Sequence, residues 1–327
     1  MKTLESVLAE LSSQRFVFVE PGGNWGDYLI YYGAQVLAKR LGVEFQTLTI
    51  KEFLAREPDD VNVYIHGGGG FNEWCSGATF VCLEHALANY EGSIVYGPCT
   101  TSINEDFLNK RFAECLENRK AKSFTIFARE NTTFDIFKRL SSFRADVNTY
   151  IDHDTAFHVT PEDVFERIGE SRDDYCLNGY RKDNESSGVK HIGNISKIVL
   201  DPPMYAKSFD HWLRLHAYAN EIITNRTHSS IIGAILGKKT SLFASKYHKN
   251  RSVWEYSMQS TSVTWVSDDK ALSIAKRGFW MSCVPNKLHT SSKVQKIVNL
   301  CQFQKISLRT RIWIYQSFLQ HIKVKIF

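Results

Sequence analysis

An arginine and a histidine stand two positions apart where a short apolar run gives way to a helical pattern. The run Ile222 to Thr224 is typical of a strand, and Arg226 and His228 follow it just before an apolar helical stretch. A guanidinium is a permanent cation, whereas an imidazole exchanges a proton near neutral pH, and the start of a helix attracts anions. This spacing indicates a corner that binds an anion and transfers a proton. A solvated or purely structural pair would have the same spacing.

Two glycine-rich turns form the second group of candidates. One apolar run, residues 16–19, ends in Gly22-Gly23-Asn24-Trp25-Gly26-Asp27, and another, residues 61–66, ends in four consecutive glycines. Neither turn has the spacing of a dinucleotide site or the Lys-Ser/Thr of a P-loop. Asn24 and Asp27 are placed to position a substrate hydroxyl, but Asp27 can equally cap the following helix, and glycines also serve tight turns. The predicted cleft-lining residues are Asn24, Gly26, Gly68, Gly69 and Gly70.

Strand and helix patterns alternate along the chain, as in parallel α/β sheets. In the first half, strands are predicted at residues 16–19, 45–50, 61–66, 93–96 and 123–128. Their polar or glycine-rich ends should meet at the carboxyl edge of one sheet, where open α/β folds bind ligands. The pattern breaks between residues 157 and 187. Beyond it, strands are predicted at 175–180, 197–200, 221–224, 240–244 and 263–266, with helices at 208–219 and 231–236 and a polar turn at 245–251.

Length and composition favour two domains and exclude several classes of protein. A chain of 327 residues exceeds what a single core usually supports, which favours two Rossmann-like α/β domains, 1–170 and 171–327, facing a cleft. A net charge of +5 is far below that of a nucleic-acid binder. The seven cysteines form no C-x-x-C pair, so reduced thiols in a cytoplasmic protein are expected, and the sequence indicates no metal site. Residues 1–16 are predicted to form an amphipathic helix rather than a secretion signal.

Several segments together resemble a known family. The string TNRTHSSIIGAILGKKTSLFASKYHKNRSVWEYS, preceded in order by GGNWGDYLIYYGAQ, HGGGGF, the Pro98 segment, FARENTTFD and DHDTAF, is similar to the polysaccharide pyruvyl transferases. The similarity covers about residues 16–256. Three positions depart from the family pattern: Thr227 stands where Leu is usual, Asn225 replaces the common Asp, and GPCTTS replaces a Pro-Gln-Ser/Thr segment.

The resemblance implies a pair of domains like those of the B-type glycosyltransferases. It also implies phosphoenolpyruvate as donor, as co-substrate with no bound cofactor, and a sugar of a surface glycan or its lipid-linked precursor as acceptor. The first domain would then hold the acceptor and the second the donor. Planar arginines suit the donor's carboxylate and phosphate, and a group that titrates near pH 7 suits protonation of its methylene carbon. The implied donor-binding residues are Arg226, Arg129, Thr227, Lys249 and Asn250; His228 is the expected general acid and Asp27 the expected base.

Other interpretations stay open at this stage. A nucleotide-sugar-dependent glycosyltransferase fits the same two-domain plan, and Asp152-His153-Asp154 has the D-x-D pattern by which such enzymes hold a metal. A non-enzymatic scaffold in a glycan-assembly complex is a third possibility. The basic tail, residues 305–327, fits an amphipathic helix that contacts the inner face of the membrane, or a final helix that packs on the first domain.

Overall fold

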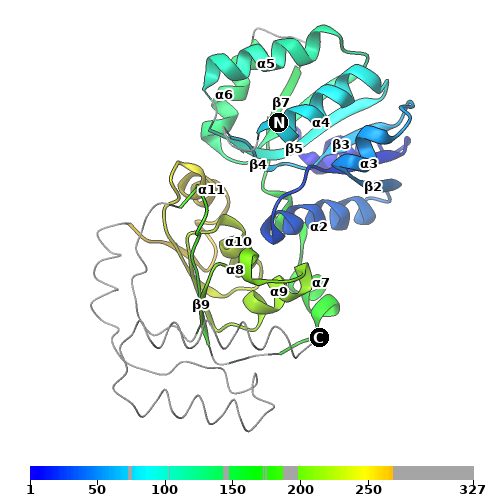
Figure 1. The fold of residues 1–327 in the computed structure, drawn as a ribbon. Helices are drawn as coiled ribbons and strands as arrows, with labels where there is room; N and C mark the ends of the chain where they lie inside the picture. Colours follow the sequence, from blue (N-terminus) through cyan, green and yellow to red (C-terminus); the bar gives the residue numbers. More distant parts are fainter. Residues whose placement is uncertain are drawn as a thin grey trace, which may run out of the picture.

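The computed structural model describes residues 1–72, 76–102, 104–142, 147–171, 173, 175–186 and 198–267. Within them the chain forms two parallel sheets flanked by helices, arranged as two lobes (Figure 1). The predicted tail helix lies outside the described residues, as do Cys75, Cys283 and Cys301. The four described cysteines, Cys82, Cys99, Cys115 and Cys176, are free thiols.

The sheet of the N-terminal lobe has the strand order β2-β1-β3-β5-β6-β7, with β4 paired to β5 off this path. From β1 the chain first adds β2 on one side and then β3 and the later strands on the other, so the order of strands reverses between β1 and β3. Parallel α/β sheets bind ligands at such a switch point. The strands are β1 (Phe16–Glu20), β2 (Phe45–Thr49), β3 (Asn62–Ile65), β4 (Gly68–Phe71), β5 (Ser93–Thr101), β6 (Ser123–Ala128) and β7 (Val147–Ile151). The helices are α1 (Leu4–Glu10), α2 (Trp25–Arg40), α3 (Ile50–Ala55), α4 (Ser76–Asn89), α5 (Glu105–Glu117) and α6 (Asn131–Ser142).

The sheet of the C-terminal lobe has the order β12-β11-β10-β8-β9, so its switch point lies between β8 and β10. A short 3-10 helix, η1 (Thr155–His158), joins the lobes. The strands are β8 (Cys176–Gly179), β9 (Ile198–Leu200), β10 (Glu221–Thr224), β11 (Lys239–Leu242) and β12 (Val263–Trp265). The helices are α7 (Pro161–Ile168), α8 (Pro202–Tyr205), α9 (Phe209–Ala217), α10 (Thr227–Ile235) and α11 (Lys249–Ser257).

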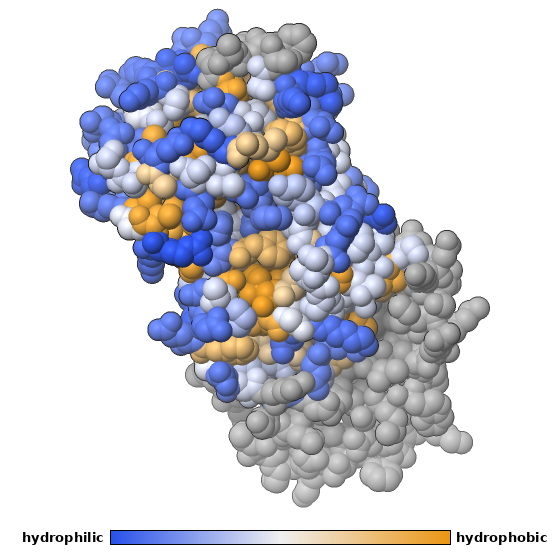
Figure 2. Space-filling view, turned by 180° about the vertical axis from the view of Figure 1, so that it is seen from behind, coloured by the Kyte–Doolittle hydropathy of each residue, from blue (hydrophilic) through white to orange (hydrophobic). Residues whose placement is uncertain are grey.

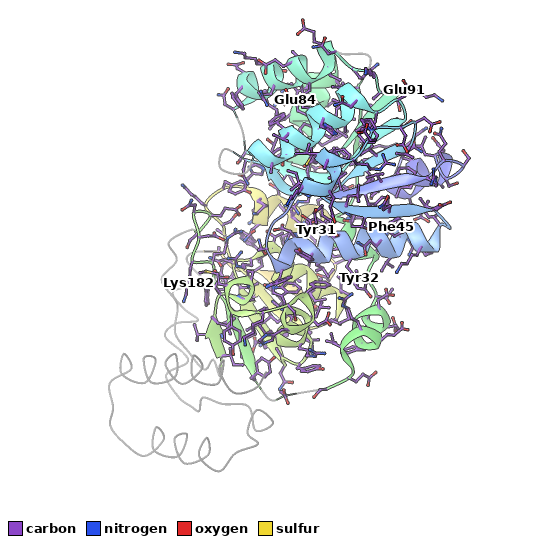
Figure 3. All side chains as sticks on the ribbon, turned by 45° about the vertical axis from the view of Figure 1, so that its right-hand side comes forward. Tyr31, Tyr32, Phe45, Glu84, Glu91 and Lys182 are labelled. Carbon is purple, nitrogen blue, oxygen red and sulfur yellow. The ribbon has the colours of Figure 1, made fainter. Side chains whose placement is uncertain are left out.

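The helix α2 packs against both lobes. Leu29 belongs to the hydrophobic core of the C-terminal lobe, whereas Leu37, two turns further on, belongs to a core cluster under the first sheet. The ring of Tyr31 lies 4.5 Å from that of His66 in the N-terminal lobe, and the ring of Tyr32 lies 5.9 Å from Phe209 in the C-terminal lobe (Figure 3). The two lobes therefore share one buried helix.

The predicted strands are confirmed, but several predicted segments differ from the structure. The first helix ends at Glu10 rather than near residue 16, and the strand predicted at 93–96 continues to Thr101. The four glycines do not form only a turn, because Gly68–Phe71 is the strand β4, paired with β5. The helix after Arg226 begins at Thr227, four residues before its predicted start, since its first turn is polar and carries no apolar pattern. The predicted polar turn ends early because Lys249 begins helix α11.

The outer surface is mainly hydrophilic, with separate apolar patches on the face shown in Figure 2. Among the described residues, none of the helices combines the length and the apolar character needed to cross a bilayer.

Candidate functional site

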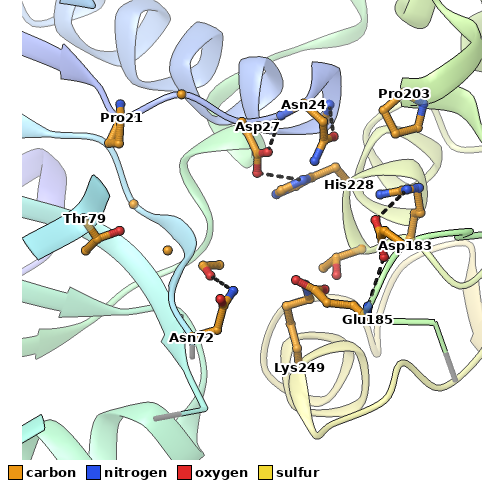
Figure 4. A pocket seen from close by; sticks show the side chains of 18 of the residues that line it. Pro21, Asn24, Asp27, Asn72, Thr79, Asp183, Glu185, Pro203, His228 and Lys249 are labelled. Carbon is orange, nitrogen blue, oxygen red and sulfur yellow. Dashed lines mark hydrogen bonds and ion pairs between the residues drawn. The ribbon is translucent and has the colours of Figure 1, made fainter. Parts of the chain in front are cut away.

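A cavity of about 600 Å³ lies between the two lobes, and both switch points open into it. The glycine turns of the N-terminal lobe form one wall; the ends of β8 and β10 and the start of α11 form the other (Figure 4). The structure thus brings together most of the residues predicted for the site. Those on the cavity wall are Asn24, Gly26, Asp27, Gly69, Gly70, Arg129, Arg226, Thr227, His228 and Lys249.

His228 lies in the first turn of α10, where it faces charged groups across the interface between the lobes. Its Nδ1 is 3.9 Å from Asp27 Oδ1, and its Nε2 is 3.6 Å from Asp154 Oδ2 and 3.4 Å from Arg129 Nη1. The side chain is 12% exposed, so it is reachable from the cavity. The imidazole thus lies among two carboxylates and one guanidinium at the cavity wall.

Asn24 and Asp27 cap the helix α2 in addition to lining the cavity. The Asn24 side chain accepts the Gly26 N–H at 2.9 Å, and Asp27 Oδ2 accepts the Asn24 N–H at 2.8 Å. This reciprocal capping box leaves Asp27 Oδ1 directed at His228 (Figure 4). The capping and the site interpretations of Asp27 are therefore compatible, because each uses a different oxygen.

Gly26 permits the close approach of the two helices that meet at the cavity. A Cβ built at this position would lie 3.0 Å from His228 Nδ1 and 3.1 Å from His228 Cβ. Such contacts are tighter than those of most real side chains, so the absence of a side chain here allows the start of α2 to reach the start of α10.

Arg129 is a fully buried cation at the end of β6. Its Nη1 donates to Asp154 Oδ2 at 2.6 Å and its Nε to Thr100 Oγ1 at 2.9 Å. Burial alone would raise the pKa of Asp154, but hydrogen bonding to His228 and the charge of Arg129 hold it well below its usual value. Asp154 therefore stays ionised and fixes Arg129. Within the part of the chain that is described, Arg129 Nη2 makes no hydrogen bond.

Arg226 is held by carboxylates of its own lobe. Its Nη2 donates to Asp201 Oδ2 at 2.7 Å and to Asp183 Oδ2 at 2.9 Å, and its Nε donates to Asp201 Oδ1. Asp201 is buried, and Arg226 side-chain exposure is 8%. Arg226 lines the cavity, but several of its N–H groups already donate to these two carboxylates. The sequence did not predict this pairing. Its role in donor binding stays a prediction.

Lys249 lies buried at the start of α11 and is paired with Glu185. Its ammonium lies 5.1 Å from the centroid of the Tyr247 ring. Burial lowers the pKa of Lys249 to about 8, aided by the charges of Arg181 and Arg129 and opposed by Glu185. The interpretation of residues 245–251 as a solvated turn is thus wrong for Lys249, because the folding of Glu185 over it removes it from water.

Thr227 and Asn250 form a buried polar pair beneath the start of α10. Thr227 Oγ1 donates to Asn250 Oδ1 at 2.7 Å, while Asn250 Nδ2 donates to the carbonyl groups of Asn225 and Phe243. Asn250 is fully buried and is not among the residues that line the cavity, and its contact with a donor stays a prediction. Its amide instead ties β10, β11 and α11 together.

The glycine strand β4 forms the wall opposite Lys249. Gly68 has φ +110°, and a Cβ there would lie 2.7 Å from Ile30; Gly68 does not line the cavity, contrary to prediction. A Cβ at Gly70 would clash with Thr79 Oγ1 at 2.4 Å. At Gly69, by contrast, the nearest atom outside the local chain is Lys249 Nζ at 3.7 Å.

Sequence reasoning missed several charged residues of the cavity. Arg181, Asp183 and Glu185 were read as part of the polar break between domains, yet they follow β8 and line the cavity. The sequence places Asp154 in the DHDTAF segment of the family resemblance and in a D-x-D metal motif, but does not predict its pairing with Arg129. In the described segments, no group of three or more His, Cys, Asp or Glu side chains is arranged to hold a metal ion. The signal available was the position of residues 181–185 directly after a predicted strand, at the edge where ligands bind.

Comparisons with known proteins bear on this arrangement. A solved structure of a functionally uncharacterized protein from Klebsiella pneumoniae subsp. pneumoniae NTUH-K2044 is similar, with a TM-score of 0.61 and 18% identity over 82% of this chain and 100% of that one. At this identity the similarity concerns the fold alone. No curated protein matches the chain. The family model for polysaccharide pyruvyl transferase matches residues 24–247, which include the glycine turns, Arg129 and the corner of Arg226 and His228. The chain therefore belongs to the polysaccharide pyruvyl transferase family.

Proposed function

We propose that the protein transfers the pyruvyl group of phosphoenolpyruvate onto two hydroxyls of one sugar in a surface polysaccharide or its lipid-linked precursor, forming a ketal. The observation that carries this proposal is the meeting of His228 with Arg129 and Lys249 in one cavity between two α/β lobes. A proton carrier beside buried cations matches a donor that bears two anionic groups and must be protonated on carbon.

The proposed reaction forms three bonds to carbon, one C–H bond and two C–O bonds. It breaks the π bond of the donor and the carbon–oxygen bond to phosphate. His228 protonates the methylene carbon of the donor, and the first sugar hydroxyl adds to the adjacent carbon while Asp27 accepts its proton. Phosphate then leaves, and the second hydroxyl closes the ring at the same carbon. One hydroxyl proton restores His228 and the other leaves on phosphate, so no oxidation or reduction takes place.

In this proposal each side chain has its own task, and both lobes contribute to each task. His228 Nδ1 and Asp27 Oδ1 are 3.9 Å apart, so a shift of about 1 Å brings the two side chains within hydrogen-bond distance for proton transfer. Arg129 is fixed by Asp154 and presents Nη2 to the donor, while Lys249 stabilises charge on the departing phosphate. Arg226 is proposed to contact the donor through the N–H groups that Asp201 and Asp183 leave unused. Thr227 is proposed to support the turn that carries Arg226 and His228.

Several further expectations belong to this proposal. We place the domain boundary near residue 170 and describe the lobes as a B-type glycosyltransferase-like pair that closes on its substrates. We expect the protein to act in the cytoplasm, at the inner face of the membrane if the acceptor is lipid-linked. The reaction needs no redox cofactor, because the oxidation state of the pyruvyl carbons as a set does not change.

The test is binding and transfer with the full chain. Thermal shift with phosphoenolpyruvate against a panel of nucleotide sugars should show stabilisation by phosphoenolpyruvate alone, and mass spectrometry of glycan acceptors should show a pyruvyl ketal. Tight binding of a nucleotide diphosphate instead would favour a nucleotide-sugar glycosyltransferase. Binding of neither ligand, with no transfer to any glycan preparation, would favour the scaffold interpretation.

A further inference from the structure

The cavity wall at Gly69 faces three hydrogen-bond donors of two lobes. From a Cβ built on Gly69, Lys249 Nζ lies at 3.7 Å, Tyr247 Oη at 3.9 Å and Arg129 Nη2 at 4.0 Å. Neighbouring glycines of the same strand lack this space, because their positions meet Ile30 or Thr79 below 3.0 Å. A site with two cations and a phenol around an unfilled position has the chemistry of an anion subsite.

The donors around this position are built into the fold rather than borne on mobile surface chains. Arg129 is fully buried and Lys249 is 5% exposed. Asp154 and Thr100 fix two nitrogens of Arg129, which leaves Nη2 as the edge that faces the cavity. Glu185 holds Lys249 from the other side and is itself paired with Arg181. Preorganised donors bind an anion without the cost of ordering long side chains.

We propose that Gly69 is a specificity-determining residue whose missing side chain leaves room for an oxygen of the donor's phosphate, held by Arg129 Nη2, Lys249 Nζ and Tyr247 Oη. This inference rests on the proposed function, and adds Gly69 and Tyr247 to the donor site. The phosphate is assigned here in preference to the carboxylate because Lys249 is the cation able to share a proton with a leaving group, whereas arginine stays charged. The carboxylate then lies on another part of the wall.

A side chain at position 69 would fill the space that the phosphate oxygen is proposed to occupy. Gly69 has no positive φ, so its backbone accepts an alanine without strain. An added methyl group would stand in the space between the strand and the three donors. The effect of Gly69→Ala is therefore expected on the ligand and little on the fold.

The experiment measures binding of inorganic phosphate and of pyruvate to the full chain by calorimetry, and the donor kinetics in parallel. Gly69→Ala should weaken phosphate binding by about tenfold or more and raise the donor KM, with kcat changed by less than about threefold. Tyr247→Phe should weaken phosphate binding by about tenfold or more, the value of one hydrogen bond to a charged group. Pyruvate, which offers only a carboxylate, should bind both variants within about twofold of the wild type.

Gly77→Ala is the matched control within the same cavity: Gly77 also lines it, but a Cβ there meets nothing within 4 Å and so none of the three donors. This variant should bind phosphate as the wild type does. Phosphate affinity of Gly69→Ala within twofold of the wild type overturns the proposal, and so does an equal loss of pyruvate binding. Circular dichroism establishes that each variant is folded. Phosphate binding that depends on Gly69, without transfer from phosphoenolpyruvate, would reject the proposed function and retain the subsite.

Discussion

At the scale of single residues, His228 belongs to the C-terminal lobe and faces Asp27 and Arg129 of the N-terminal lobe. Replacing it with alanine removes the proposed acid but leaves Arg129 and Lys249 in place, so donor binding should persist while turnover falls by at least about a hundredfold. Calorimetry with phosphoenolpyruvate and a single-turnover transfer assay separate these two effects. Normal turnover in this variant would remove His228 from the role of acid.

Lys249 gives the site a dependence on pH. Its pKa of about 8 lies below the ordinary 10.5, so the ammonium is charged below pH 8 and loses its proton as the pH rises through that value. The donor's phosphate is already mostly doubly ionised at pH 7 and changes little above it. The donor KM should therefore rise between pH 7 and pH 9 in the wild type.

Lys249→Met provides the control for this dependence. It lacks the titrating group, so its donor KM should be high and nearly constant from pH 7 to pH 9. A flat wild-type profile, or the same slope in the variant, would show that another group is responsible.

At the scale of elements, the site depends on how closely α2 approaches α10. Gly26→Ala would place a methyl group 3.0 Å from His228 Nδ1, so His228 must shift and kcat should fall by tenfold or more. The helix itself should gain up to about 1 kcal/mol from replacing glycine. Kinetics and thermal unfolding of the single variant test both statements.

A double variant shows whether this loss acts through His228. Gly26→Ala combined with His228→Ala should be no slower than His228→Ala alone, because the two changes affect one contact. If the losses multiply instead, Gly26 acts by another route.

The elements also show what the sequence could predict and what it could not. Apolar runs such as Phe16–Val19 identified the strands because burial on both faces leaves a continuous pattern. Strand β4 was missed because glycines have no side chains to form a pattern. The pairing of Arg226 with Asp201 joins residues 25 positions apart at the ends of β10 and β9, which lie on either side of β8, and no local pattern reveals it. The residue types of the site could thus be predicted from the sequence. Which carboxylate pairs with which cation could not, because these pairs form only in the folded chain.

At the scale of the whole molecule, the shared helix α2 couples the stability of the lobes. Leu29 is fully buried in the core of the C-terminal lobe, and Trp25 Nε1 donates to the Ala206 carbonyl at 2.8 Å. Leu29→Ala should cost about 2–5 kcal/mol of the free energy of unfolding. Because α2 also packs beneath the first sheet, calorimetry should show one transition, lowered in temperature as a unit. Two separate transitions, only one of them shifted, would show that the lobes unfold independently.

The buried pair of Thr227 and Asn250 has a consequence for protein engineering. Placing at position 227 the leucine that the family resemblance leads us to expect there would look like a consensus mutation, a common means of raising stability. Here it would leave Asn250 Oδ1 without its donor inside the protein, at a cost of about 1–3 kcal/mol. Threonine at 227 and asparagine at 250 are therefore coupled choices, and an ancestral or consensus redesign of this chain has to exchange both positions together or neither.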